Sequence, residues 1–197
     1  MYQNKIITEP KWKSWIIQTT TPLFTPDQCN QIIASGRAQK PQQAQVGINK
    51  PRGETDTKKR VTTISWIPFQ EMGHMYQDLN KFIQKANQNH FGFGDIQITE
   101  NAQFTEYPEG GFYDWHIDCD VNMEHEPPVR KISMTLLLND PAEFEGGDLE
   151  LMAPGRYAEL KQGHAICFAS FLNHRVNPVT KGMRQSLVCW FGGKPFR

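Results

Sequence analysis

The sequence predicts a mainly β domain with helical support toward its N-terminus, and three observations lead to this prediction. From about residue 95 onward, short apolar segments of strand length follow one another, each bounded by Gly, Pro, Asn or Asp. Before that point, two segments carry apolar residues at helical spacing. The chain has 197 residues, 38% of them hydrophobic, which is enough for one domain with a substantial core. We therefore expect a single domain over 1–197, with helical support and early strands in 1–94 and a β core in 95–197.

Two helices are expected in the first half. Thr25 to Gln28 reads Thr-Pro-Asp-Gln, which combines an N-cap threonine, a proline at the first helical position and a glutamine three residues after the cap. A longer helix is predicted over Phe69–His90, where apolar residues recur at helical spacing. Strand-like Val46–Ile48 and Val61–Ile67 lie between the helices. They flank the polar segment 49–60, expected to be a long hairpin loop.

Seven strands are expected in the second half. They are 96–106, 112–117, 131–138, 148–152, 164–169, 176–179 and 185–191. Short strands at this spacing, without a helical period between them, are typical of a sandwich, a barrel or a jelly roll.

Charge and composition exclude several classes of protein. The 21 Lys and Arg residues balance 21 Asp and Glu residues, so the chain lacks the basic excess that nucleic-acid or anionic-membrane binding requires. Its longest apolar stretches are far shorter than a membrane span, and residues 1–13 contain no apolar core of a secretion signal. We expect a cytoplasmic protein without a membrane or nucleic-acid partner. The four cysteines, which include no CxxC pair, are expected to be buried thiols.

His116 and Asp118 form an H-x-D pair early in the predicted β core. Because side chains alternate along a strand, both point to the same face, which suits metal binding. His174 supplies a third ligand if the later strands fold back beside the first, as in a jelly roll. Two histidines and a carboxylate on one face of a metal leave three positions open, as in non-haem Fe(II) oxygenases. Zinc hydrolases more often have three histidines, or two with a glutamate, and one open position.

Three nearby residues are rival or neighbouring candidates for the metal site. His164 competes as the distal ligand, but it follows a glycine at the start of an apolar strand, where a role at the strand end is common. Asp120 has the same strand parity as Asp118 and competes with it. Cys119 points the opposite way and is expected outside the ligand set.

Three spaced motifs surround these candidates. They are Tyr107-x2-Gly110-x2-Tyr113-x2-His116-x-Asp118, then Asn139-Asp140 followed by Glu145-Gly146-Gly147-Asp148-Leu149, and Gly163-x4-Phe168-x5-His174-x-Val176-x-Pro178-Val179-x2-Gly182-x-Arg184. Through them, a stretch from about residue 100 to 192 closely resembles the prolyl and lysyl hydroxylase-like (prolyl 4-hydroxylase-type) branch of the Fe(II)/2-oxoglutarate-dependent dioxygenases. The resemblance implies a double-stranded β-helix (jelly roll) core. The N-terminal third is only compatible with the helical support that such enzymes carry.

The resemblance also implies roles for particular residues. His116, Asp118 and His174 match the iron ligands, and Arg184 matches the basic residue that pairs with the distal carboxylate of 2-oxoglutarate. A buried dianion needs such a fixed opposite charge, and a guanidinium offers two parallel hydrogen bonds. A surface salt bridge is the alternative interpretation of Arg184. Tyr107 matches a tyrosine of the same pocket whose phenol can hydrogen-bond the cosubstrate.

The sequence departs from the family at the second polar contact to 2-oxoglutarate. On the strand that corresponds to Lys131–Asn139, related prolyl hydroxylases often have a tyrosine or threonine. The matching positions of this chain are Leu137 and Ser133. Ser133, or Thr135 on the same face, is the expected substitute.

Three further residues are expected in the substrate pocket. Trp190 shares a strand face with Arg184 and matches an aromatic residue of the pocket mouth in the family, and Tyr113 is a second candidate. Arg130 lies where some relatives have an arginine that meets the peptide substrate. A charged residue at the start of a strand is also common, and the sequence alone slightly favours that interpretation of Arg130.

The resemblance implies an Fe(II)- and 2-oxoglutarate-dependent dioxygenase that uses O2 to hydroxylate an unactivated C–H bond, foremost in a prolyl residue of a peptide or protein. Hydroxylation of a free amino acid or another small metabolite is the alternative. A non-enzymatic sensor or binding module is less favoured, because the sequence has all three candidate metal ligands and Arg184. The segment 49–60 and the loop 119–129 favour a peptide, although a merely solvated loop explains 49–60 equally well. The oligomeric state is not predicted.

Overall fold

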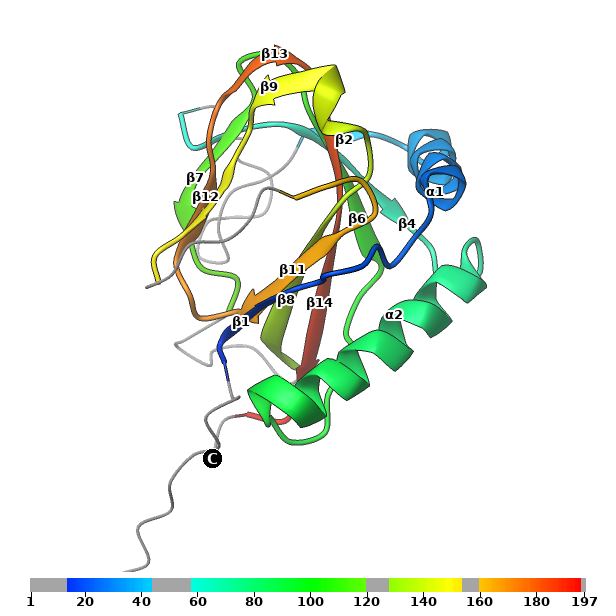
Figure 1. Cartoon of the computed structure of the whole chain (residues 1–197), viewed down its shortest axis with the longest axis vertical. Helices are drawn as coiled ribbons and strands as arrows, with labels where there is room; N and C mark the ends of the chain where they lie inside the picture. The colour runs from blue at the N-terminus through cyan, green and yellow to red at the C-terminus, as the bar shows by residue number, and fades with distance from the viewer. Residues whose placement is uncertain (1–13, 44–57, 120–127, 154–159, 196–197) are drawn as a thin grey trace, which may run out of the picture.

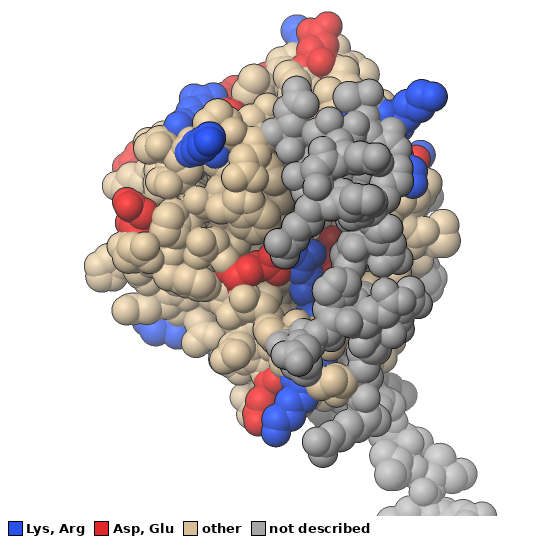
Figure 2. All heavy atoms as spheres, turned by 180° about the vertical axis from the view of Figure 1, so that it is seen from behind, with Lys and Arg blue, Asp and Glu red and all other residues tan. Residues whose placement is uncertain are grey.

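The computed structural model describes residues 14–43, 58–119, 128–153 and 160–195. The predicted strand Val46–Ile48, most of the segment 49–60 and Asp120 lie outside the described residues. Within them, no helix is long and apolar enough to cross a membrane. Figure 2 shows acidic and basic side chains interspersed over the described part of one face. This distribution matches the balanced charge of the sequence.

Two antiparallel sheets face each other in a jelly-roll arrangement (Figure 1). In spatial order, the large sheet consists of β1 (Ile16–Gln18), β11 (Ala165–Ala169), β8 (Val129–Leu137), β14 (Arg184–Gly193), β6 (Ala102–Tyr107), β4 (Thr63–Ile67) and β2 (Gln42–Gln43), and β5 (Gln97–Ile98) also pairs with β14. The smaller sheet consists of β10 (Leu149–Leu151), β12 (His174–Val176), β7 (Phe112–His116) and β3 (Arg60–Val61), and a separate pair is formed by β13 (Val179–Gly182) and β9 (Phe144–Gly146). The mainly β fold with helical support that the sequence predicts is confirmed.

The helices α1 (Pro26–Ala38) and α2 (Gly73–Ala86) lie on one side of the large sheet (Figure 1). Their apolar faces form the main core with the outward side chains of the sheet, among them Phe104 and Leu187. Helix α1 comes very close to β6, because a Cβ atom at Gly36 would lie only 2.3 Å from the ring of Phe104. The hydroxyl of Ser65 also donates to the carbonyl oxygen of Gly36 over 2.6 Å. This face of the large sheet therefore carries the core.

The predicted capping box begins α1 as expected. The Thr25 hydroxyl accepts a hydrogen bond from the Gln28 backbone, and the Gln28 side chain accepts one from the Thr25 backbone. Helix α2 begins at Gly73 rather than at Phe69, so the predicted start is wrong. Phe69 lies in the preceding turn, 43% exposed, and its ring contacts that of Tyr76. Phe69 fitted the helical spacing, but it contacts Tyr76 from outside the helix.

Three predicted strands are divided in the structure. Val61–Ile67 separates at Thr62 into β3 of the smaller sheet and β4 of the large sheet. The strand 96–106 separates into β5 and β6, because Thr99 turns aside to donate both its backbone N–H and its hydroxyl to the carbonyl oxygen of Trp190. The strand 176–179 is not one strand, since Val176 ends β12 and Val179 begins β13. Pro178 lies between them and has no N–H to donate to a ladder.

Candidate active site

The inner face of the large sheet is polar, although its side chains are buried. These residues come from β6, β8 and β14 and include Gln103, Thr105, Ser133, Thr135, Arg184 and Ser186. Strand alternation explains the contrast with the apolar outer face, because successive side chains point to opposite sides of the sheet. Buried polar groups are costly unless they find partners, so a polar interior is typical of a ligand site.

His116, Asp118 and His174 converge at the open end of the smaller sheet. His116 ends β7, Asp118 follows it by two residues, and His174 begins β12 directly opposite His116 in the ladder. The Asp118 carboxylate lies 3.7 Å from His116 Nε2 through one oxygen and 3.5 Å from His174 Nε2 through the other. One ligand atom from each residue fits within 4.8 Å of the other two, which is compatible with a shared metal ion.

Both histidines present the correct nitrogen for a metal. His116 Nδ1 lies 2.8 Å from the carbonyl oxygen of Asp114, and His174 Nδ1 lies 3.0 Å from that of Leu172. A carbonyl oxygen only accepts hydrogen bonds, so each Nδ1 carries a proton and Nε2 is the nitrogen that can bind a metal. Metal-binding histidines are held in this way by a partner on their second nitrogen.

Asp118 is held by serines on neighbouring strands. The Ser133 hydroxyl on β8 donates to Asp118 Oδ2 over 2.7 Å and lies 2.9 Å from the Ser170 hydroxyl. The backbone N–H of Asp118 donates to the carbonyl oxygen of Ser170. Because the hydroxyl proton of Ser133 points to Asp118, Ser170 donates to Ser133. Ser133 thus orients a carboxylate in this structure, and its expected contact with the cosubstrate stays a prediction.

The protonation states suit a cationic ligand. Burial alone would raise the pKa of Asp118, but His174, His116 and Arg130, together with the Ser133 hydrogen bond, hold it at about 2. Burial, and then the neighbouring His174, lowers the pKa of His116 to about 4. Near neutral pH, Asp118 is therefore ionised and His116 is neutral, as metal ligation requires.

Arg184 is the charged residue at the other end of the interior. Its side chain is only 3% exposed and faces Tyr107, its partner across the β14–β6 ladder. The guanidinium donates to the Ser186 hydroxyl over 3.1 Å and lies 5.6 Å from the centre of the Tyr107 ring. Among the described residues, no carboxylate forms an ion pair with it. A buried guanidinium without an anion is a site prepared for an anionic ligand.

Gly147 makes room for the Arg184 side chain. A Cβ atom at Gly147 would lie 2.8 Å from Arg184 Cδ, and Gly147 has a φ of +71°. Only glycine adopts this conformation readily, and only glycine leaves this space. The Gly-Gly-Asp motif of the sequence therefore adjoins the proposed cosubstrate site.

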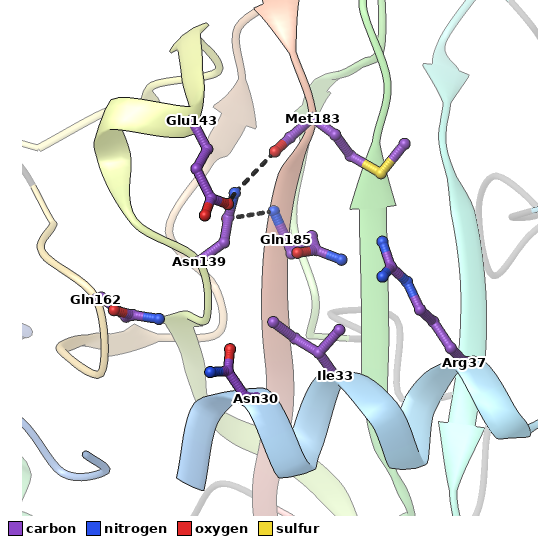
Figure 3. A pocket seen from close by; sticks show the side chains of 8 residues that line it. All are labelled: Asn30, Ile33, Arg37, Asn139, Glu143, Gln162, Met183 and Gln185. Carbon is purple, nitrogen blue, oxygen red and sulfur yellow. Dashed lines mark hydrogen bonds between the residues drawn. The ribbon is translucent and has the colours of Figure 1, made fainter. Parts of the chain in front are cut away.

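Asn139 supports Arg184 from the outer face of the sheet (Figure 3). Its amide nitrogen donates to the Met183 carbonyl oxygen, and its amide oxygen accepts from the Gln185 backbone N–H, both over 2.9 Å. These groups line a surface pocket of about 340 Å³ beside α1. Other polar groups of the pocket are also paired, since Arg37 and Gln185 both bind Glu106. The side chains that line the pocket stabilise β14, and the pocket is not a second ligand site.

Tyr113, Trp190 and Arg130 surround the metal-binding residues. The Tyr113 ring stacks on His116 with 3.5 Å between centroids. Trp190 lies opposite Ser133 in the β14–β8 ladder, and its buried Nε1 has no hydrogen-bond partner. The Arg130 guanidinium lies 3.9 Å from the centre of the Trp190 ring and makes two hydrogen bonds of 2.7 Å to Glu100. Arg130 is therefore held against the Trp190 ring, and its contact with a substrate stays a prediction.

The other sequence candidates lie elsewhere or have other contacts. His164 is at the beginning of β11, where its Nδ1 faces the carbonyl oxygen of Thr19 at 3.1 Å, and it does not join the three metal-binding residues. Cys119 is buried beside Ser170 and is likewise outside that group. Sequence reasoning missed the supporting role of Asn139, whose motif was noted without a function, and the burial of Arg60. An Asn directly after a run of three leucines could have indicated a residue that binds the backbone at the end of a strand.

Comparisons with known proteins agree with this geometry. The model of the 2OG-Fe(II) oxygenase superfamily matches residues 102–192. A PKHD-type hydroxylase of Colwellia psychrerythraea is 43% identical over 130 residues, which are 57% of this chain and 55% of that protein. The chain spans about half the length of the curated relatives that it matches.

Two solved structures show the same fold. A Pseudomonas putida prolyl-4-hydroxylase has a TM-score of 0.68 and 22% identity, with 92% of this chain and 94% of that one covered. A viral collagen prolyl hydroxylase of Paramecium Bursaria Chlorella virus-1, solved as a 2OG complex, has a TM-score of 0.70 and 17% identity, covering 91% of this chain and 97% of that one. At these identities, the likeness concerns the fold alone.

Proposed function

We propose that the chain is an Fe(II)- and 2-oxoglutarate-dependent dioxygenase that hydroxylates a prolyl residue in a peptide or protein, and the match of residues 102–192 to the 2OG-Fe(II) oxygenase superfamily supports this. One observation carries the proposal: a His-Asp-His group with a buried carboxylate and a buried arginine that has no ion pair among the described residues share one polar interior. The first suits a divalent metal and the second suits a dicarboxylate. These are the two components that this superfamily uses.

In this proposal, His116, Asp118 and His174 hold the iron. The donor set fits Fe(II), since two imidazoles and one carboxylate leave three positions for other ligands. The two Nδ1 hydrogen bonds and the Ser133 hydroxyl keep the ligand atoms in place before the metal binds. Such partners typically change metal affinity about 10- to 100-fold.

Arg184 binds the distal carboxylate of 2-oxoglutarate, and Tyr107 borders the same end of the site. The guanidinium is already desolvated and fixed by Ser186, so little ordering is needed when the carboxylate arrives. When bound, Fe(II) and 2-oxoglutarate supply the oxidising power that places one oxygen atom of O2 in the substrate and the other in succinate. The residues of the chain orient the two reactants and exclude water.

The substrate is expected at the mouth formed by Tyr113, Trp190 and Arg130. The unpartnered Trp190 Nε1–H is a donor for a carbonyl oxygen, and the ring offers the flat apolar surface that a proline packs against. The PKHD-type and prolyl hydroxylase names of the relatives support a prolyl substrate. A cytoplasmic location stays a prediction.

The test is turnover by the iron-loaded protein. Succinate formation from 2-oxoglutarate is measured first, and a library of proline-containing peptides is then searched by mass spectrometry for the gain of one oxygen atom. His174→Ala should abolish iron binding and turnover, whereas His164→Ala, the matched control, should keep both. Loss of activity in His164→Ala with full activity in His174→Ala would refute the ligand assignment. Oxidation of a free amino acid instead of any peptide would replace the prolyl substrate and leave the metal site unchanged.

A further inference from the structure

Arg60 is a second buried arginine near the metal-binding residues, and among the described residues it forms no ion pair. Its side chain is 9% exposed, and its Nε is a buried donor without a hydrogen bond. Among the described residues, no carboxylate pairs with it. Arg60 lies on β3, the edge strand of the smaller sheet, opposite Tyr113 on β7. This is a different element from those that carry Arg184 and Arg130.

The ring of Tyr113 holds the Arg60 guanidinium in place. The guanidinium carbon lies 4.3 Å from the ring centre, and the same ring stacks on His116 at 3.5 Å. A cation over an aromatic ring gains about 0.5–2 kcal/mol, but the ring leaves the N–H donors of the guanidinium unsatisfied. Burial raises the pKa of the Tyr113 phenol to about 12, so Tyr113 is neutral and is no counterion.

The nearby acids are already engaged. Asp118 faces the two histidines, and Glu100 makes a two-pronged ion pair with Arg130. If 2-oxoglutarate binds Arg184 and iron binds Asp118, each of those charges gains a partner, but Arg60 gains none. Charges buried in proteins are normally paired, and within the described part of the chain no acid is left to pair with Arg60, which makes it a candidate to bind an acidic group of the substrate.

We propose that Arg60 forms a subsite for a carboxylate of the substrate, an Asp or Glu side chain near the hydroxylated residue. This inference rests on the proposed function. The two stacking distances place the guanidinium no more than about 8 Å from the centre of the His116 ring. An extended peptide advances about 3.3 Å per residue, so the acidic residue is expected within about three positions of the reacting one. A guanidinium can hold a carboxylate by two parallel hydrogen bonds, which favours Asp or Glu over Asn or Gln.

The test compares blocked proline peptides that differ only by Glu or Gln at each position near the proline. Binding is measured by calorimetry, and hydroxylation by mass spectrometry. The wild type should prefer the Glu peptide about tenfold or more at one position. Arg60→Met should remove this preference. Arg60→Lys keeps the positive charge but loses the two parallel N–H donors, so it should keep part of the preference. Lys85→Met, which removes a charge from the end of α2, is the control for general charge attraction.

The outcomes separate the subsite from the proposed function. Selective binding of a Glu peptide without hydroxylation would support the subsite and refute the prolyl hydroxylase. Equal binding of Glu and Gln peptides by the wild type, or no binding of any peptide, would overturn the subsite. A rise in the KM for 2-oxoglutarate in Arg60→Met, with the Glu preference intact, would assign Arg60 to the cosubstrate and also overturn it. Arg60→Met should keep its melting temperature, because it removes an unpaired buried charge.

Discussion

Asn139 binds the backbone immediately before and immediately after Arg184. Its amide donates to the carbonyl oxygen of Met183 and accepts from the N–H of Gln185, so one side chain spans the residue between them. Arg184 points into the interior, whereas Asn139 lies on the outer side of the sheet beside α1 (Figure 3). The direction of the guanidinium is therefore fixed through the strand that carries it.

The first prediction concerns this clamp. Asn139→Ala should raise the KM for 2-oxoglutarate about tenfold and lower stability by about 1–3 kcal/mol, because two backbone groups lose their partners. Asn139→Asp keeps the acceptor for Gln185, but it loses the donor to Met183 and Glu143 and brings a second carboxylate beside Glu143, so it should be at least as unstable as Asn139→Ala. Steady-state kinetics and thermal unfolding provide the measurements. A variant with lower stability but an unchanged KM would show that Asn139 acts on the fold alone.

Gly147 gives a second prediction, with a matched control in the same chain. Gly147→Ala brings a methyl group to 2.8 Å from Arg184 Cδ and should raise the KM for 2-oxoglutarate at least about tenfold. Gly110 has a similar φ of +78° but nothing within 4 Å of the position of a Cβ atom. Gly110→Ala therefore carries the backbone strain without the contact, and should leave the KM near that of the wild type. Equal effects in both variants would mean that strain, and not the displaced arginine, is responsible.

The third prediction separates two possible roles of Ser133, which are to orient Asp118 and to bind 2-oxoglutarate. If Ser133 orients Asp118, Ser133→Ala should weaken iron binding about 10- to 100-fold and leave the KM for 2-oxoglutarate nearly unchanged at saturating iron. If it instead binds the cosubstrate, the KM should rise while iron affinity stays the same. Metal titration by calorimetry and steady-state kinetics measure the two quantities. Thr135→Ala tests the other candidate on the same strand face: a rise in the KM for 2-oxoglutarate in this variant alone would assign the cosubstrate contact to Thr135.

The pKa of His116 predicts how stability depends on pH in the metal-free protein. Its folded value of about 4 lies below the ordinary 6.5, so between these values the unfolded chain binds more protons and stability falls as the pH falls. Between about pH 7 and about pH 5, this group should cost about 2 kcal/mol. Asp118 acts in a lower window, because its stabilising contribution is lost only below its unfolded value of 3.8.

Urea denaturation in the presence of a chelator tests this dependence. His116→Gln should lose about 2 kcal/mol less than the wild type between the same two pH values. An identical loss in both proteins would assign the pH dependence to other groups.

The fold could be predicted largely because its signals are local. The capping box of α1 and the alternation of β14 depend on residues a few positions apart. The start of α2 was wrong because Phe69 makes an apolar contact with Tyr76 from outside the helix, and a periodic pattern does not distinguish the two.

The grouping of the metal-binding residues was expected from spacing and resemblance, and the structure brings them together. The partners that orient them could not be predicted, since Ser133 and Ser170 meet Asp118 only through the pairing of β8 with β11. Arg60 also appeared in the sequence as one of several loop cations. The burial of Arg60, which leaves its Nε without a hydrogen bond, could not be predicted from the sequence.

The alternation of β14 places two adjacent residues in unlike surroundings, because Arg184 faces the polar interior and Gln185 faces the pocket beside α1. A slip of one residue in this strand would exchange them, since every side chain of a strand changes sides when its register moves by one. The Gln185 amide would then point into the interior in place of the Arg184 guanidinium. The guanidinium would lie on the outer side, among the side chains that bind Glu106. The same slip would turn Leu187 and Cys189 out of the core. Insertions within β14 are thus excluded by folding and by ligand binding at once.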